Sequence, residues 1–192
     1  MKKKPTERPS LELLEAEIKR VRYKNRYRTV LRSTVFTLIT VAAIAVLVAT
    51  LWLPVLQIYG SSMAPTLLEG EILFSVKTAD MDQGDIIAFY FNNKILVKRV
   101  IAGPGDWVDI DEDGTVYVNE VALDEPYLAE KASGDPDIEL PYQVPENKIF
   151  VMGDDRATSS DSRHTAVGCV DREQIVGKIV FRIWPFERIG GF

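Results

Sequence analysis

An uncharged, almost wholly apolar stretch lies between two polar regions of this chain. No charged residue occurs from Ser33 to Leu68, and residues 34–56 are nearly all apolar. A helix needs roughly 20 apolar residues to cross the hydrocarbon core of a bilayer. We therefore expect one N-terminal transmembrane signal-anchor helix over residues 33–56.

Residues 1–32, which precede this stretch, contain a second helical pattern. Ser10 is a candidate N-cap, and apolar side chains then recur at helical spacing, at Leu11, Leu14, Ile18 and Val21. Residues 19–32 are rich in Lys and Arg, which suits a short amphipathic juxtamembrane helix facing anionic lipid. A short dimerising coil is the alternative, although barely two heptads support it. Residues 1–9 are polar, and we expect them to be disordered.

Beyond the apolar stretch the pattern predicts short β-strands. Runs rich in Val, Ile, Phe and Tyr are bounded by turn residues, and Asn92-Asn93 between two such runs predicts a hairpin. The expected strands are 71–76, 85–91, 94–102, 107–110, 115–119, 148–152 and 176–183. Residues 130–147 hold three prolines and many polar groups, which indicates a surface excursion. We expect residues 57–192 to form one mainly β domain, an antiparallel barrel or packed sheets.

The charge distribution predicts a topology. The net charge is −5, but residues 1–33 carry 11 Lys/Arg and 4 Asp/Glu, a balance of +7. Positive charge beside the first span marks the cytoplasmic side, so we expect residues 1–32 inside the cell and the β domain on the extracytoplasmic face of the membrane. A cleaved signal peptide is the alternative, but its apolar core is typically about 7–15 residues and its leader short.

Cysteine and histidine usage narrows the chemistry. Cys169 is the single cysteine, which excludes an intramolecular disulfide and a Cys-rich metal site. His164 is the single histidine, so a multi-histidine metal centre is excluded and no metal is expected. A hydrolase built on this chain has to use another base, and a serine nucleophile with a lysine base is a recognised variant of the Ser-His-Asp arrangement.

Lys98 and Ser62 are the candidate catalytic pair. Strand alternation places Lys98 on one face with Leu96 and Val100, where burial would lower the lysine pKa and leave the amine neutral. A strand lysine more often reaches solvent along its stem, and a serine before a proline is more often a turn residue. However, Gly60 frees the backbone ahead of Ser62, so that loop can aim a hydroxyl and an N–H at one point.

A third polar cluster covers residues 153–163. Its hydroxyls and opposite charges suit a buried network that orients a catalytic lysine, and a solvated polar loop is the alternative reading. The cluster lacks the twelve-residue calcium pattern with a terminal Glu.

Taken together and in this order, the motifs resemble those of bacterial type I signal peptidases, which are membrane-bound serine–lysine proteases. The resemblance covers about residues 58–189, and 107–148 corresponds to a short insertion, as in the compact forms of the family. The matching segments are Gly60-Ser61-Ser62-Met63-Ala64-Pro65-Thr66-Leu67, Gly84-Asp85-Ile86-Ile87-Ala88-Phe89, Lys98-Arg99-Val100-Ile101-Ala102-Gly103-Pro104-Gly105-Asp106 and residues 153–163.

The resemblance implies a role for each matched residue. Ser62 would attack the substrate to form an acyl-enzyme, Lys98 would be the general base, and no cofactor would be needed. Ser159 would hydrogen-bond the lysine, Asp161 and Arg163 would brace the site, and Gly60 would lie at the oxyanion position. The residues implied for the substrate pocket are Ile58, Leu67 and Val97. Substrates would be exported preproteins with Ala-X-Ala-like cleavage sites, met at the lipid bilayer, and no nucleic-acid partner is expected.

Three departures from the family pattern are visible. Asp155 stands where the family usually has Asn, residues 164–167 form a slightly longer loop than usual, and Gly60 replaces the serine of some members.

Three alternatives remain open. A eukaryotic-type signal peptidase would use histidine at the position of Lys98, and a self-processing serine–lysine repressor would need a DNA-binding domain. The third is a membrane-tethered β-domain that only binds partners.

Overall fold

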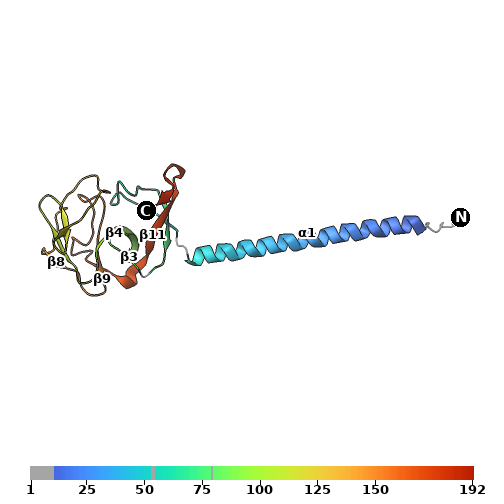
Figure 1. Ribbon diagram of the computed structural model, residues 1–192, viewed down its shortest axis with the longest axis horizontal. Helices are drawn as coiled ribbons and strands as arrows, with labels where there is room; N and C mark the ends of the chain where they lie inside the picture. The colour runs from blue at the N-terminus through green and yellow to red at the C-terminus, as the bar shows by residue number, and fades with distance from the viewer. Residues whose placement is uncertain (1–10, 53–54, 79) are drawn as a thin grey trace. The chain divides into compact units, whose positions relative to one another are not determined.

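The computed structural model describes residues 11–52, 55–78 and 80–192, which divide into two compact units, residues 1–49 and 50–192. The expected N-cap Ser10 and the expected disorder of residues 1–9 lie outside the described residues. Figure 1 shows helix α1 in the first unit and a β domain in the second.

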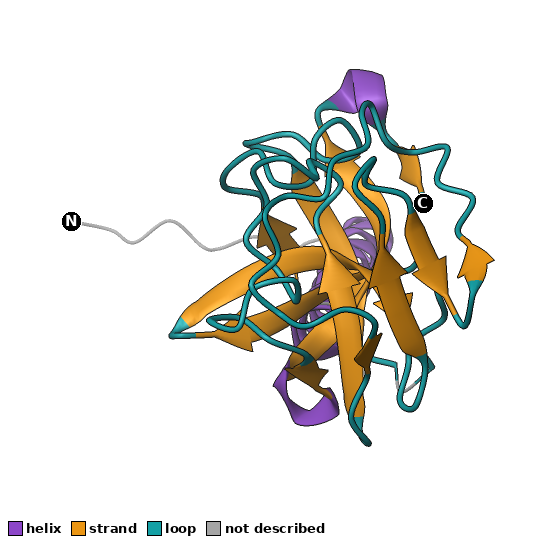
Figure 2. Ribbon diagram, turned by 90° about the vertical axis from the view of Figure 1, so that its left-hand side faces the viewer, coloured by secondary structure: helices purple, strands orange, loops and turns teal. Residues whose placement is uncertain are grey.

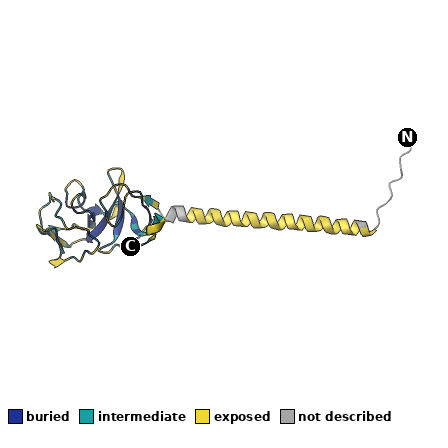
Figure 3. Cartoon of the chain, turned by 90° about the horizontal axis from the view of Figure 1, so that it is seen from above, coloured by how far each residue is buried: buried dark blue, intermediate teal, exposed yellow. Residues whose placement is uncertain are grey.

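Helix α1 runs without a break over Leu11–Trp52. Within it, Leu14–Val48 contains the one stretch of the described chain that is long and apolar enough to cross a membrane, and none of it is buried (Figure 3). Thr37 and Thr40 donate their hydroxyls to carbonyls four residues earlier, at 2.9 Å, which satisfies their polar groups inside an apolar segment. A helix that is apolar all round suits a bilayer better than water.

The expected helix over 33–56 is too long at its C-terminal end. Val55–Gln57 forms strand β1, whose backbone pairs with β2 (Ile72–Val76). The β domain therefore begins at residue 55 rather than 57. The apolar pattern could not separate the two elements, because a short strand on an apolar core has the same composition as the end of a membrane helix.

The larger sheet of the β domain is antiparallel (Figure 2). Of the candidate residues it carries Val97 and Lys98, and the others lie in the loops over 58–67 and 153–163. Its strand order is β1-β2-β11-β3-β4-β9-β10, with β12 also paired to β11. The remaining strands are β3 (Ile86–Phe91), β4 (Lys94–Ala102), β9 (Lys148–Met152), β10 (Val170–Asp171), β11 (Ile175–Trp184) and β12 (Gly190–Gly191). The predicted hairpin joins β3 to β4, and Asn92 and Asn93 adopt the positive φ angles of 44° and 61° that a tight hairpin turn requires.

The smaller sheet has the order β7-β6-β5-β8. Its strands are β5 (Trp107–Ile110), β6 (Val116–Val118), β7 (Val121–Ala122) and β8 (Tyr142–Gln143). Two 3-10 turns, η1 (Arg172–Gln174) and η2 (Phe186–Arg188), flank β11. The expectation of a mainly β domain built from antiparallel sheets is confirmed.

Strand β4 lies in the middle of the larger sheet and links its packed faces. One core cluster contains Ile58, Met63, Leu67 and Ile86, and another contains Ile87, Phe89 and Val100. Along β4 all five residues from Lys98 to Ala102 are buried, so the lysine is held in the interior. Arg99 is the register partner of Met152 at the end of β9, and the polar loop 153–163 therefore starts beside Lys98.

Candidate active site

Lys98 is buried, with 3% of its surface exposed. Its Nζ donates a hydrogen bond of 2.8 Å to Ser159 Oγ. Burial lowers the pKa of Lys98 from 10.5 to about 8, and the Asp161 carboxylate, the largest opposing influence, limits the fall. The Arg163 guanidinium lowers this pKa further, whereas Asp154 and Asp155 raise it. A large fraction of the amine is therefore neutral near pH 8, which a general base requires.

Asp161 and Arg163 form a fully buried ion pair beside this lysine. Arg163 Nε lies 2.9 Å from Asp161 Oδ1, and Arg163 Nη2 lies 2.9 Å from Oδ2, a two-pronged contact. Asp161 Oδ2 also accepts from the Gly153 N–H at 2.9 Å. The arginine and this N–H hold the pKa of Asp161 below its usual range although burial acts against them. The carboxylate thus stays charged and ties the two ends of loop 153–163 together.

Gly153 is the point where the parts of the site meet. A Cβ atom built on Gly153 would overlap both Ser159 Oγ and the Ser62 carbonyl oxygen. The Ser62 carbonyl also accepts a hydrogen bond of 3.1 Å from the Asp155 N–H. The backbone of Ser62 is therefore packed directly against the loop that binds the Lys98 amine.

The segment that carries Ser62 is fixed from both sides. Gly60 has φ of +86°, a conformation that side-chain-bearing residues rarely adopt. On the other side, Arg182 Nη2 donates to the Thr66 carbonyl at 2.7 Å, and Arg188 Nη2 donates to the Pro65 carbonyl at 3.2 Å. These contacts restrict the loop around Ser62, which is itself half-buried and reachable from outside.

A groove of about 750 Å³ opens beside Ser62. Two short stretches of chain form its walls, residues 55–63 and the first half of β4, and most of the lining is apolar. Ile58 and Val97 line this groove. The groove has the size and the apolar character of a site for a peptide or another partly apolar ligand.

Comparison with known proteins identifies the family of this site. Residues 31–184 match the family model described as signal peptidase, peptidase S26. The chain belongs to the signal peptidase family. It is 36% identical over 175 residues to signal peptidase I of Streptococcus pneumoniae, with 71% of this chain and 84% of the relative covered. It is 40% identical over 150 residues to signal peptidase IB of Staphylococcus aureus, with 68% and 77% covered.

A solved signal peptidase I from Enterococcus faecalis V583 is 31% identical, covers 53% of this chain and 98% of its own, and has a TM-score of 0.43. The family model and the relatives in Streptococcus pneumoniae and Staphylococcus aureus confirm the family resemblance seen in the sequence. As a member of the signal peptidase I family, the chain is a serine hydrolase, and its long apolar helix is that of a membrane-anchored enzyme.

Of the three expected pocket residues of this signal peptidase, two line the groove and one does not. Ile58 is buried and Val97 half-buried, and both border the groove. Leu67 has no exposed surface and packs in the same core cluster as Ile58 and Met63. It is not among the residues that line the groove. The pocket role expected for Leu67 stays a prediction.

The departures from the family pattern have local explanations. Asp155 is half-buried, and its carboxylate accepts from the Thr158 hydroxyl at 2.7 Å, which gives the extra charge a partner. Residues 164–167 form a compact turn in which Val167 N–H and Gly168 N–H donate to the His164 carbonyl at 3.0 and 2.8 Å. Among the residues that the structure describes, no group of three or more His, Cys, Asp or Glu side chains could share a metal ion.

Two buried ion pairs next to the site were not predicted from the sequence. Arg99, which follows Lys98, binds both oxygens of Asp154, at 2.9 and 2.6 Å. Arg156 binds both oxygens of Glu125. The first pair joins two of the motif segments, so the sequence did hold a signal for it: an Arg and an Asp of opposite charge, one in each segment. Nothing in the sequence marks Glu125, whose partner lies 31 residues further along the chain.

Proposed function

We propose that this protein is a membrane-anchored signal peptidase that cleaves signal peptides from exported preproteins, with Ser62 as nucleophile and Lys98 as general base. The observation that supports this most strongly is the buried amine of Lys98, held by Ser159 next to the Ser62 segment and with a pKa of about 8. Its relatives in Streptococcus pneumoniae and Staphylococcus aureus are signal peptidases by name.

The proposed chemistry is acyl transfer to serine. Neutral Lys98 removes the proton from the Ser62 hydroxyl while Ser62 Oγ attacks the scissile carbonyl. The Ser62 N–H stabilises the resulting oxyanion, a task that falls to the backbone because Gly60 has no hydroxyl to contribute. The Lys98 ammonium then protonates the leaving amine, and the neutral lysine later takes a proton from the water that hydrolyses the ester.

The groove suggests how substrate is recognised. An extended signal-peptide segment would lie along residues 55–60 and the first half of β4, with main-chain hydrogen bonds supplying affinity. Ile58 and Val97 would narrow the pocket before the cut, since close apolar walls exclude side chains much larger than Ala. This agrees with the preference for Ala-X-Ala-like sites that the family resemblance implies.

The proposed topology follows from charge and from α1. The basic residues before the span would stay in the cytoplasm, α1 would cross the bacterial membrane once, and the β domain would act on the extracytoplasmic face. The enzyme and its membrane-bound substrate would then share a thin layer, which raises their effective concentration.

The direct test of this function is cleavage of a preprotein by the purified full-length protein in detergent. Mass spectrometry of the products should show one cut after an Ala-X-Ala-like sequence, and none in a preprotein whose Ala residues at those positions are replaced by large side chains. Cleavage that ignores these replacements would count against the proposed specificity.

The rate of cleavage should depend on pH through Lys98. Because only the neutral amine accepts a proton, kcat/KM should rise about tenfold per pH unit at acidic pH and level off above the lysine pKa, which burial sets at about 8. A pH profile on a short peptide substrate measures this. His164→Ala is the control and should keep the same profile, whereas a flat profile down to pH 5 would exclude Lys98 as the base.

The position of β1 predicts where the anchor can be removed. Deleting residues 1–54 should leave an enzyme that cuts a soluble peptide normally and embedded preproteins more slowly, because the shared layer is lost. Deleting residues 1–57 also removes β1, which pairs with β2 and lines the groove, so cleavage of the soluble peptide should fall as well. Equal peptide cleavage by both truncated proteins would contradict the assignment of the groove.

A further inference from the structure

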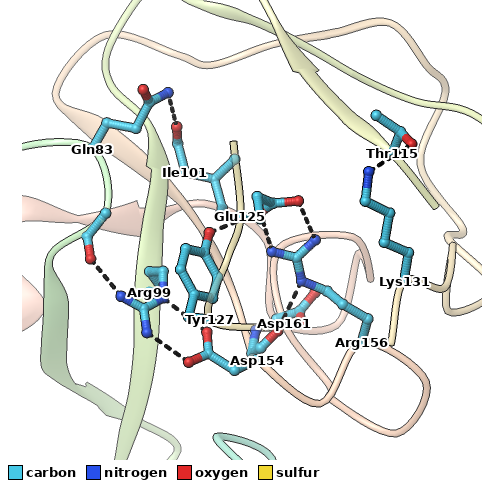
Figure 4. A network of polar contacts seen from close by, with 12 residues as sticks. Gln83, Arg99, Ile101, Thr115, Glu125, Tyr127, Lys131, Asp154, Arg156 and Asp161 are labelled. Atoms are coloured by element: carbon cyan, nitrogen blue, oxygen red, sulfur yellow. Dashed lines mark hydrogen bonds and ion pairs between the residues drawn. The ribbon is translucent and has the colours of Figure 1, made fainter. Parts of the chain in front are cut away.

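The segment after β7 leaves the smaller sheet and contacts the loop 153–163, here called the site loop, through the side chain of Glu125. The Glu125 side chain is fully buried, and each of its carboxylate oxygens accepts from the Arg156 guanidinium, one of them at 3.1 Å. Oε1 also accepts from the Tyr127 hydroxyl at 2.8 Å. Figure 4 shows Glu125 and Tyr127 facing Arg156 and Arg99 within one polar network.

Arg156 connects this carboxylate to both ends of the loop 153–163. Its Nε donates to the Gly153 carbonyl at 3.0 Å. Its own carbonyl accepts from Arg163 Nη1 at 2.9 Å. Gly153 is packed against Ser159 and Ser62, and Arg163 holds Asp161. The Arg156 side chain therefore fixes the Gly153 end of the loop, which is packed against Ser159, while the Arg156 backbone binds the Arg163 end.

The same segment makes further contacts with the loop. The Ser133 carbonyl accepts from Arg163 Nη1 at 2.6 Å. Gly134 is pressed so closely against Arg163 Nη1 and the Arg156 carbonyl that a Cβ atom would overlap both. The Tyr127 ring stacks 3.8 Å from the Arg99 guanidinium, which in turn binds Asp154. Residues 125–134 thus contact the site loop at several points. Among these contacts, the charged side chain is supplied by Glu125.

We infer that Glu125 is a positioning residue for the proposed reaction: it aligns Arg156, and through Arg156 it holds loop 153–163 so that Ser159 meets the Lys98 amine. This inference rests on the proposed function of Ser62 and Lys98. A buried ion pair is a weak source of stability, because an apolar pair of similar size often does as well. The planar fork of Arg156 binds the Glu125 carboxylate and the Gly153 carbonyl at the same time, which suits a role in orientation.

Two variants of the full-length protein in detergent test this role. Glu125→Gln leaves Arg156 charged and without its carboxylate partner. Glu125→Met combined with Arg156→Met replaces the pair with apolar side chains. Because no unpaired charge remains, we expect the double variant to fold. We expect both to lose about a hundredfold in kcat, because small misplacements of catalytic groups carry costs of this size. KM should change little, because neither residue lines the groove.

A second readout separates positioning from a purely structural role. If the loop loosens, water reaches Lys98, and the acidic limb of the pH profile should move towards higher pH. The charged groups that act on Lys98, namely Asp154, Asp155, Asp161 and Arg163, are unchanged in both variants. Glu139→Gln removes an exposed carboxylate from the same 107–148 insertion and should keep the wild-type kcat and pH profile.

Near-ultraviolet circular dichroism shows which variants are folded, and the kcat and pH profile of a folded variant decide whether the positioning role holds. A folded double-Met protein with wild-type kcat and an unshifted pH profile would overturn the positioning role and leave Glu125 a structural residue. Ser62→Ala is measured in parallel. If Ser62→Ala is inactive while the Glu125 variants are normal, this inference alone fails, and if Ser62→Ala still cleaves, the proposed function fails.

Discussion

Ser62→Ala and Lys98→Ala should each abolish preprotein cleavage while leaving the protein folded. Without the hydroxyl no acyl-enzyme can form, and without the amine no group remains to take its proton. Removing one member of such a pair costs on the order of 10⁴–10⁶ in kcat in serine hydrolases. Turnover of a peptide substrate and of a preprotein, followed by mass spectrometry, measures the loss.

The double variant gives a sharper check of the same pair. Because Ser62 and Lys98 act as a unit, Ser62→Ala combined with Lys98→Ala should be no slower than the slower single variant. If the loss of kcat in the double variant equalled the product of the two single losses, the two residues would act independently. A folded single variant with substantial activity would remove that residue from the mechanism.

The second large effect is expected at Gly153. In Gly153→Ala the new methyl group would overlap Ser159 Oγ and the Ser62 carbonyl oxygen. Overpacking of this kind costs about 1–3 kcal/mol in folding free energy, and it separates the groups that must meet Lys98. We expect cleavage to fall at least about a hundredfold, together with a lower midpoint of thermal unfolding.

Gly190→Ala is the matched control for this change. A Cβ atom on Gly190 meets no other atom within 4 Å, so this variant should unfold and cleave like the wild type. Normal cleavage by Gly153→Ala would show that the contact between the Ser62 segment and loop 153–163 does not govern the chemistry.

The sequence predicted the longer strands of this fold and missed the short ones. Strands over residues 94–102, 107–110 and 148–152 are confirmed with the expected bounds, because runs rich in Val, Ile and Phe carry a clear signal. Strands β7, β8, β10 and β12 have only two residues each. They exist because a neighbouring strand supplies hydrogen-bond partners, and no pattern of two residues can show this.

In the site, too, features that depend on local sequence were predicted, and contacts between distant residues were not. The position of Lys98 between Leu96 and Val100 predicted an inward-facing amine, and Lys98 is buried. Alternation alone does not explain this burial, because β4 is buried on both faces from Lys98 to Ala102. Glu125 and Arg156 meet only because the smaller sheet packs beside the site loop. That packing depends on contacts over long sequence separations, which a single sequence does not record.

Chemical replacement of the Lys98 amine tests the central claim most directly. Lys98→Cys, made with Cys169→Ala so that no other thiol is present, should be inactive. Treatment with bromoethylamine then rebuilds an amine with a sulfur in its chain, and the sulfur lowers the amine pKa. We predict that cleavage returns with its acidic limb at a lower pH than in the wild type. A folded, fully modified protein that stays inactive, or one whose acidic limb does not move, would contradict the role of Lys98 as the base.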